Sequence, residues 1–272
     1  MLEKKPIKHF IKRGNHDKET YFFDVDGTLV DPATGQIPDS TLTTLEELQK
    51  RDHLICIATG RPLFHPENPK FFSTISWDGY ICCNGLAVYN NKKEPVSLHA
   101  MTSKSIEQCI QVTQQNNFNL LFEEEHNFYL LNDQLEYVEE TQRFLNQTIP
   151  PLGTYNDQDI YGLMVYAPKG YDYKEYFSID GIDVFPGQSA YADIVKVGAN
   201  KYSGISELMD YYGYSSYIAF GDSNNDLEML ENADLSICLG QGSKEAKSVS
   251  KYITTPVDQD GIYLACKYFK LI

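Results

Sequence analysis

Residues 21–29 read Tyr21-Phe22-Phe23-Asp24-Val25-Asp26-Gly27-Thr28-Leu29, and they are the clearest sequence indication of the fold class. Its apolar start predicts a buried strand, which ends where two aspartates and a glycine begin a loop. Outward from this point, short apolar strands alternate with amphipathic helices near both ends of the chain. That alternation predicts an α/β fold with a doubly wound, mostly parallel sheet that helices cover on both faces.

Further strands of this sheet are expected as short apolar runs along the chain. They lie at 53–58, 79–83, 217–220, 235–239 and 251–254. The apolar residues of the middle segment instead follow the pattern of hairpins and separate helices, which predicts an inserted α+β domain. We therefore expect three parts: a basic extension at 1–19, a core formed by 20–89 and 188–272, and the inserted domain at 90–187.

The 272-residue chain has the composition of an ordinary globular protein, with 42% hydrophobic and 22% charged residues. Its net charge of −15 opposes contact with nucleic acid and anionic membranes, so neither is expected as a partner. No run approaches the roughly 20 apolar residues that cross a bilayer, and the first residues do not resemble a secretory signal. We expect a cytoplasmic protein, monomeric or weakly dimeric, whose six cysteines are reduced and buried.

Asp24 and Asp26 are the first candidates for chemistry, because they stand two residues apart at a strand end and are expected to point to one side. Two close carboxylates repel each other, and a divalent cation would relieve this repulsion while one carboxylate attacks an electrophile. A solvated acidic turn is the alternative interpretation. The apolar strand before the pair and the Gly27-Thr28-Leu29 run after it favour a reactive site.

Four segments in order resemble the motifs of the haloacid dehalogenase-like phosphohydrolases. The run from Asp24 to Leu29 is similar to the first motif, Thr59-Gly60-Arg61 to the second and Lys201 to the third. Residues 221–230, Gly-Asp-Ser-Asn-Asn-Asp-Leu-Glu-Met-Leu, resemble the fourth. The large insertion between the second and third motifs is similar to that of the Cof-type phosphatases. The resemblance covers the chain from residue 20 onward and implies a Rossmann-like core whose inserted cap selects the substrate.

This resemblance implies a Mg²⁺-dependent phosphatase that acts in two steps on a small-molecule phosphate ester. Asp24 would attack phosphorus and form an aspartyl-phosphate, while Asp26 would protonate the leaving oxygen and then deprotonate water. The Asp24 side chain, the Asp26 backbone carbonyl and Asp222 would hold the Mg²⁺ ion. Sugar phosphates or phosphorylated cofactors would be the substrates.

Further residues would act on the phosphoryl group. The Thr59 hydroxyl and the Gly60 amide can donate hydrogen bonds to its oxygens, and Lys201 can place a cation beside them. The resemblance adds Asn225 as a phosphoryl contact. It also implies that Asp226 orients either Lys201 or the water around the metal.

Three residues stay open between a functional and a structural interpretation. Arg61 either contacts substrate or pairs with a core carboxylate. Asn84 either contacts substrate or only forms a turn. Lys196 is a rival to Lys201, although Lys201 opens a predicted helix as the motif requires.

The chain departs from the Cof-type pattern after its fifth expected strand. A Met-Gly-Asn-Ala type segment is usual there, whereas this chain has Cys238-Leu239-Gly240-Gln241-Gly242-Ser243. The contact made by the Gly240-Gln241-Gly242 loop is therefore open. Its Gly-x-Gly pattern is only a weak sign of a dinucleotide loop, because the third glycine is missing.

Two alternatives to a phosphatase remain. A phosphomutase of the same superfamily can share the first motif and the cap, although residues 221–230 look more like the hydrolase version. A non-catalytic sensor of phosphorylated metabolites would use the same pocket. Such a sensor would have no need of both a nucleophile and an acid, and the chain retains Asp24 and Asp26.

Overall fold

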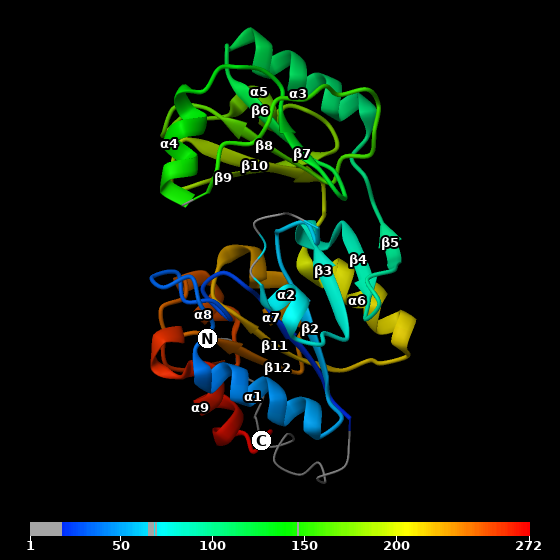
Figure 1. The fold of residues 1–272 in the computed structure, drawn as a ribbon, viewed down its shortest axis with the longest axis vertical. Helices are drawn as coiled ribbons and strands as arrows, with labels where there is room; N and C mark the ends of the chain where they lie inside the picture. Colours follow the sequence, from blue (N-terminus) through cyan, green and yellow to red (C-terminus); the bar gives the residue numbers. More distant parts are fainter. Residues whose placement is uncertain (1–17, 65–67, 69, 146) are drawn as a thin grey trace. The chain divides into compact units, whose positions relative to one another are not determined.

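The computed structural model describes residues 18–64, 68, 70–145 and 147–272, so the extension expected at 1–19 lies outside the described residues except for its last two. Contacts divide the chain into two compact units (Figure 1). The first unit comprises the chain up to Gly60, Ser73–Ser97 and Asn200–Ile272, and the second comprises Arg61–Phe72 and Leu98–Ala199. Among the described residues, no helix is both long and apolar enough to cross a membrane.

An eight-stranded sheet forms the centre of the first unit. Its strands are β1 (Thr20–Phe23), β2 (Leu54–Ala58), β3 (Gly79–Cys82), β4 (Ala87–Asn90), β5 (Pro95–Leu98), β11 (Tyr217–Gly221), β12 (Leu235–Cys238) and β13 (Tyr252–Ile253). They lie in the order β13-β12-β11-β1-β2-β3-β4-β5. All pairings from β13 to β3 are parallel, and β4 pairs with β3 in the antiparallel direction.

The helices of the first unit cover both faces of this sheet, because the central strands β1, β2 and β11 are buried along their whole length. The helices are α1 (Asp39–Lys50), α2 (Phe71–Thr74, whose last two residues belong to this unit), α6 (Lys201–Tyr212), α7 (Leu227–Asn232), α8 (Lys244–Val249) and α9 (Gly261–Tyr268). Phe22 packs among residues of α6, α7 and α8. Tyr21, on the other face of β1, lies near Cys266 of α9, and α9 packs against α1 (Figure 1). This is the doubly wound α/β arrangement that the sequence predicts.

Within the described part of the first unit, three single-turn 3-10 helices lie among the loops. They are η2 (Cys83–Gly85), η3 (Asn224–Asp226) and η4 (Val257–Gln259). They begin one, three and four residues after the ends of β3, β11 and β13, respectively. All six cysteines of the chain are buried thiols, as the sequence predicts.

The second unit is a five-stranded antiparallel sheet with helices. Its strands are β6 (Asn119–Glu123), β7 (Phe128–Leu130), β8 (Gly162–Tyr166), β9 (Ile182–Pro186) and β10 (Tyr191–Lys196), in the order β7-β6-β8-β10-β9. Its helices are α3 (Ser103–Gln115), α4 (Glu136–Leu145) and α5 (Lys174–Phe177). Helices α3 and α5 share one apolar core with one face of the sheet. Helix α4 adds Val138 to a smaller cluster on the other face.

The boundaries of the two units differ from the expected division at 90 and 187. Strand β10 falls within the stretch expected to belong to the core, but it pairs in antiparallel fashion with β8 and β9 of the second unit. At the other boundary, β5 adds to the edge of the first sheet, so the first unit continues to Ser97. Strand pairing, which the order of apolar residues does not reveal, sets both limits.

Candidate active site

The ends of β1 and β11 bring two aspartates together. The two strands are parallel neighbours, so Asp24 after one and Asp222 after the other leave the sheet at the same edge. The Asp24 backbone N–H donates to the Phe220 carbonyl at 3.0 Å. The Thr28 hydroxyl donates to Asp222 Oδ1 at 3.1 Å, which ties the loop after β1 to the loop after β11.

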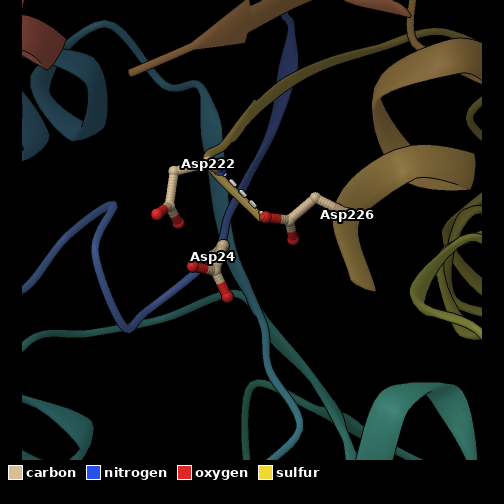
Figure 2. Close-up of side chains that lie close together, drawn as sticks. All are labelled: Asp24, Asp222 and Asp226. Atoms are coloured by element: carbon tan, nitrogen blue, oxygen red, sulfur yellow. Dashed lines mark hydrogen bonds between the residues drawn. The ribbon is translucent and has the colours of Figure 1, made fainter. Parts of the chain in front are cut away.

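A third carboxylate, Asp226, completes an acidic cluster at this edge. One oxygen of each of Asp24, Asp222 and Asp226 lies within 4.8 Å of the others. Figure 2 shows the three carboxylates gathered together, with the hydrogen bond from the Asp222 backbone to Asp226 dashed. Asp226 Oδ2 accepts the backbone N–H groups of Asp222 and Ser223, both at 2.9 Å. The chain from Asp222 to Asp226 therefore folds back on itself around one carboxylate.

Lys201 joins two of these carboxylates. Its ammonium group donates to Asp24 Oδ1 at 2.5 Å and to Asp226 Oδ1 at 2.7 Å, and its side chain has no exposed surface. Helix α6 fixes this position, because Lys201 is its first residue and the Asn200 side chain caps the helix by accepting the Ser203 N–H at 3.0 Å. The rival Lys196 belongs to the second unit, where it donates to a backbone carbonyl.

The charges of this cluster are unbalanced, because three carboxylates face one ammonium group. Burial raises the pKa of the Asp24 carboxyl well above its usual value, and neighbouring Asp226 adds to the rise against the opposing effect of Lys201. Burial and Asp226 also raise the pKa of Asp222 to about 6. Burial lowers the pKa of the Lys201 amine, but the attraction of Asp226 and Asp24 outweighs it and the pKa lies above its usual value. Lys201 is therefore charged, and the site favours one more cation.

The donor set fits a hard divalent cation such as Mg²⁺. Asp24 Oδ2 is buried and accepts no hydrogen bond from the described residues. A buried carboxylate oxygen in that state is unfavourable unless a proton or a metal ion meets it. Carboxylate oxygens are also the ligands that Mg²⁺ prefers in proteins.

Four more of the predicted residues lie together: Thr59 and Gly60 after β2, Asn84 after β3, and Asn225 in η3 after β11. Thr59 directly follows β2, and its carbonyl accepts the Asn84 N–H at 3.1 Å. A Cβ atom at Gly60 would stand 3.2 Å from the Asn84 amide nitrogen, which is closer than most Cβ atoms approach a neighbour. The Asn225 amide donates to Asn84 Oδ1 at 3.3 Å. Asn84 thus contacts both predicted phosphate-binding segments, and it holds a left-handed backbone with a φ of 51°.

Asp26 and Arg61 lie outside the acidic cluster. Asp26 is exposed whereas Asp24 is buried, because β1 ends at Phe23 and the alternation expected of a strand does not continue through the turn. Arg61 belongs to the second unit. There, burial and Asp193 raise the pKa of Glu123 to about 8, against the lowering effect of the Arg61 charge.

Two contacts at the site had no separate signal in the sequence. The Gln241 side chain donates to the carbonyl of Gly27, and the Ser243 N–H donates to the Asp222 carbonyl at 2.7 Å. Both come from the loop after β12, where the chain departs from the Cof-type pattern. The departure from that pattern marked the loop as unusual, but it did not indicate which residues the loop contacts.

Comparisons with known proteins agree with this geometry. The sequence model of the haloacid dehalogenase-like hydrolase family matches residues 21–265. The 5-amino-6-(5-phospho-D-ribitylamino)uracil phosphatase YitU of Bacillus subtilis is 28% identical over 265 residues, which cover 91% of this chain and 96% of that protein. The HAD subclass IIB sugar phosphatase BT4131 is 27% identical, with a TM-score of 0.83 over 94% of this chain and all of that one.

A second solved structure extends the likeness in fold. The phosphatase BT1666 of Bacteroides thetaiotaomicron has a TM-score of 0.86 over 96% of this chain and 98% of its own, at 24% identity. With the family match spanning nearly the whole chain, the resemblance drawn from the four motifs is confirmed. The chain therefore belongs to the haloacid dehalogenase-like hydrolases and is a phosphatase enzyme of that family.

Proposed function

We propose that this phosphatase depends on Mg²⁺ and hydrolyses small phosphate monoesters through an aspartyl-phosphate on Asp24. The observation that carries the proposal is the buried group of Asp24, Asp222 and Asp226 around Lys201. In this group Asp24 has one oxygen bonded to a cation and one without a hydrogen-bond donor. Both features suit a nucleophile that must be held in one orientation and approach a negatively charged phosphate.

Asp24 and Asp222 are the proposed side-chain ligands of Mg²⁺, and the family resemblance adds the backbone carbonyl of Asp26. Both oxygens of Asp226 already accept hydrogen bonds, from Lys201 on one side and from backbone N–H groups on the other. We therefore assign Asp226 to holding Lys201 and the Asp222 turn in place. When bound, Mg²⁺ would offset the negative charge that carboxylates and phosphate bring to one place.

In the first step, an Asp24 oxygen forms a bond to phosphorus while the bond from phosphorus to the ester oxygen breaks. The departing oxygen takes a proton from Asp26, whose exposed side chain can exchange protons with water. Lys201 holds the attacking carboxylate in one orientation and favours its ionised form. The Thr59 hydroxyl and Gly60 N–H are the proposed donors to the phosphoryl oxygens.

In the second step, water attacks phosphorus and the bond from phosphorus to Asp24 breaks. Asp26, deprotonated by the first step, takes the proton from water. Inorganic phosphate leaves and the Asp24 carboxylate is restored. Asn225 and Asn84, which are joined by a hydrogen bond, are proposed to position the phosphoryl group during both steps.

Sugar phosphates and phosphorylated cofactors are the proposed substrate class. This choice follows the names of the relatives, one a phosphatase of a phosphoribitylamino uracil and the other a sugar phosphatase. We propose that the second unit is the cap that selects among such substrates, with Arg61 as one of its contacts. The cytoplasmic location, the lack of nucleic-acid and membrane partners, and the monomeric or weakly dimeric state stay predictions.

A phosphate-release screen over a broad panel of phosphorylated metabolites tests the proposal. The Asp24→Asn protein keeps the size of the side chain but removes the nucleophile, so turnover of any accepted ester should fall at least about 1,000-fold. Asp210→Asn is the matched control, because Asp210 is exposed on α6. Its activity should stay within about twofold of the parent protein.

The outcomes separate the candidate functions. Release of phosphate into water by the parent protein supports a phosphatase, and turnover that requires a bisphosphate activator would indicate a phosphomutase. Tight binding of an ester without turnover would indicate a sensor. Full activity in Asp24→Asn would rule out the covalent mechanism.

A further inference from the structure

The loop Gly240–Ser243 after β12 contacts both catalytic turns of the first unit. Its Gln241 side chain donates to the carbonyl of Gly27 in the turn after β1. The Ser243 N–H donates to the Asp222 carbonyl in the turn after β11, at 2.7 Å. One short loop therefore bonds to the two segments that carry Asp24 and Asp222.

The Gln241 amide uses both of its ends. Its nitrogen donates to Gly27, and its oxygen accepts the Val257 N–H at the start of η4 at 3.1 Å. Only one orientation of the amide serves a carbonyl on one side and an N–H on the other, since the nitrogen is a donor and the oxygen an acceptor. The Gln241 amide group is thus hydrogen-bonded both to η4 and to the turn after β1.

The backbone of the same loop lies too close to Asp222 for a side chain. A Cβ atom at Gly242 would stand 2.7 Å from the Asp222 carbonyl oxygen. The turn after β1 is equally close, because a Cβ atom at Gly27 would stand 2.5 Å from Asp222 Oδ2, and Gly27 has a φ of 88°. A small rotation of the Gly27 peptide would therefore change the contacts of Asp222 and of the neighbouring Thr28 hydroxyl.

We propose that Gln241 is a positioning residue for the reaction, because it fixes the Gly27–Thr28 peptide against Asp222. The inference rests on the proposed function, since it is this turn that carries Asp26 next to Gly27. It assigns a role to the position at which the chain departs from the Cof-type pattern. Without the Gln241 bond, the turn after β1 loses this link to η4, while its own backbone hydrogen bonds and the Thr28 contact with Asp222 remain.

Amide hydrogen exchange tests the inference without any assay of activity. Gln241→Met removes both hydrogen bonds at nearly constant volume, whereas Gln241→Glu keeps the acceptor for Val257 and removes only the donor to Gly27. Exchange in the peptide that spans 24–30 should become several-fold faster in both variants, because local opening needs less free energy. The strand β2 should exchange as before.

Gln49→Met is the matched control. The Gln49 amide also donates to a backbone carbonyl, that of Ser76 at 2.5 Å, but neither residue belongs to the site. Exchange in the 24–30 peptide should not change in this variant. If the two Gln241 variants also leave that peptide unchanged, the inference is wrong, whatever the activity of the protein.

Kinetics and metal binding supply the second readout. In Gln241→Met, kcat should fall on the order of 10- to 100-fold while KM changes little, because misplacement of reacting groups acts on the chemical step. Calorimetric titration with MgCl₂ should give a weaker Kd than in the parent and Gln49→Met proteins. An unchanged kcat in a folded Gln241→Met protein would overturn the inference.

Failure of the proposed function has a different signature. If the parent protein itself releases no phosphate and binds no Mg²⁺, the phosphatase mechanism fails, but the exchange experiment still decides whether Gln241 fixes the turn. If the parent is active and the Gln241 variants change neither amide exchange, nor kcat, nor the Kd for Mg²⁺, only the inference fails.

Discussion

Lys201 offsets part of the charge repulsion in the acidic cluster. A lysine with no exposed surface is rare unless it is paired, and Lys201 is paired with both Asp24 and Asp226. Its charge in turn lowers the free energy of keeping two carboxylates ionised out of water. Removing one partner of such a group leaves uncompensated charges behind, which is more costly than the loss of one hydrogen bond.

The exchange Lys201→Met tests this dependence. Phosphate release should fall about 100-fold or more, because Asp24 loses the cation that orients it. The free energy of unfolding should fall by about 3–5 kcal/mol at pH 8. The loss should be smaller at pH 5, because carboxyl groups without a cation take up protons more readily and a neutral carboxyl needs no partner.

Lys196→Met is the matched control, since Lys196 was the rival candidate in the sequence and its ammonium group donates to the Ala100 carbonyl of the second unit. Its phosphate release should stay within about threefold of the parent value. Rates measured side by side, together with chemical denaturation at both pH values, check the prediction. Equal losses in the two variants would contradict the assignment of Lys201.

Among the elements, the start of α6 depends on a close approach to η2. Gly85 ends η2 with a φ of 98°, and a Cβ atom there would stand 2.1 Å from the Asn200 carbonyl oxygen. Asn200 caps the helix whose first residue is Lys201. The position of Lys201 is therefore set by the backbone of a neighbouring turn as well as by its ion pairs.

Gly85→Ala should be much more costly than Gly213→Ala. Gly213 also has a positive φ, of 75°, but nothing lies within 4 Å of its missing Cβ. Both variants carry backbone strain of about 1–2 kcal/mol, and Gly85→Ala adds a collision with backbone that cannot be relieved by side-chain rotation. Urea denaturation should show the larger loss in Gly85→Ala, accompanied by lower phosphate release. Equal stability losses would show that η2 moves away freely.

The sequence could predict elements whose local pattern fixes them, and it could not predict which elements pair. Asp24 and Asp222 each follow a continuous apolar run, so their positions at strand ends could be inferred. Strand β10 has an alternating pattern that suits either sheet, and only its pairing with β8 assigns it to the second unit. The bond from Gln241 to Gly27 joins residues 214 positions apart, and no local pattern encodes such a contact.

For the whole molecule, the net charge of −15 sets the electrostatic problem that the site must solve. A phosphate ester approaches an acidic protein, and the described site offers Lys201 against three carboxylates. Lys201 is occupied by two of these carboxylates already. Binding of a divalent cation would therefore do two things at once: it would attract the substrate and stabilise the folded chain.

Metal removal should consequently lower both activity and stability, and Mg²⁺ should restore both. A ligand at 100 times its Kd that binds only the folded state adds about 2.7 kcal/mol to the free energy of unfolding, which for a protein of this size raises Tm by several degrees. Scans in EDTA and in MgCl₂ measure the shift. Asp222→Asn should lose this Tm shift and Asp210→Asn should keep it, because Asp222 belongs to the cluster and Asp210 does not.

A protein that releases phosphate equally well in EDTA, with the same Tm, would have to neutralise its carboxylates by protonation alone. The rate of such an enzyme would rise toward acid pH as Asp222, whose pKa burial and Asp226 raise to about 6, takes up a proton, so the pH profile in EDTA would identify that alternative.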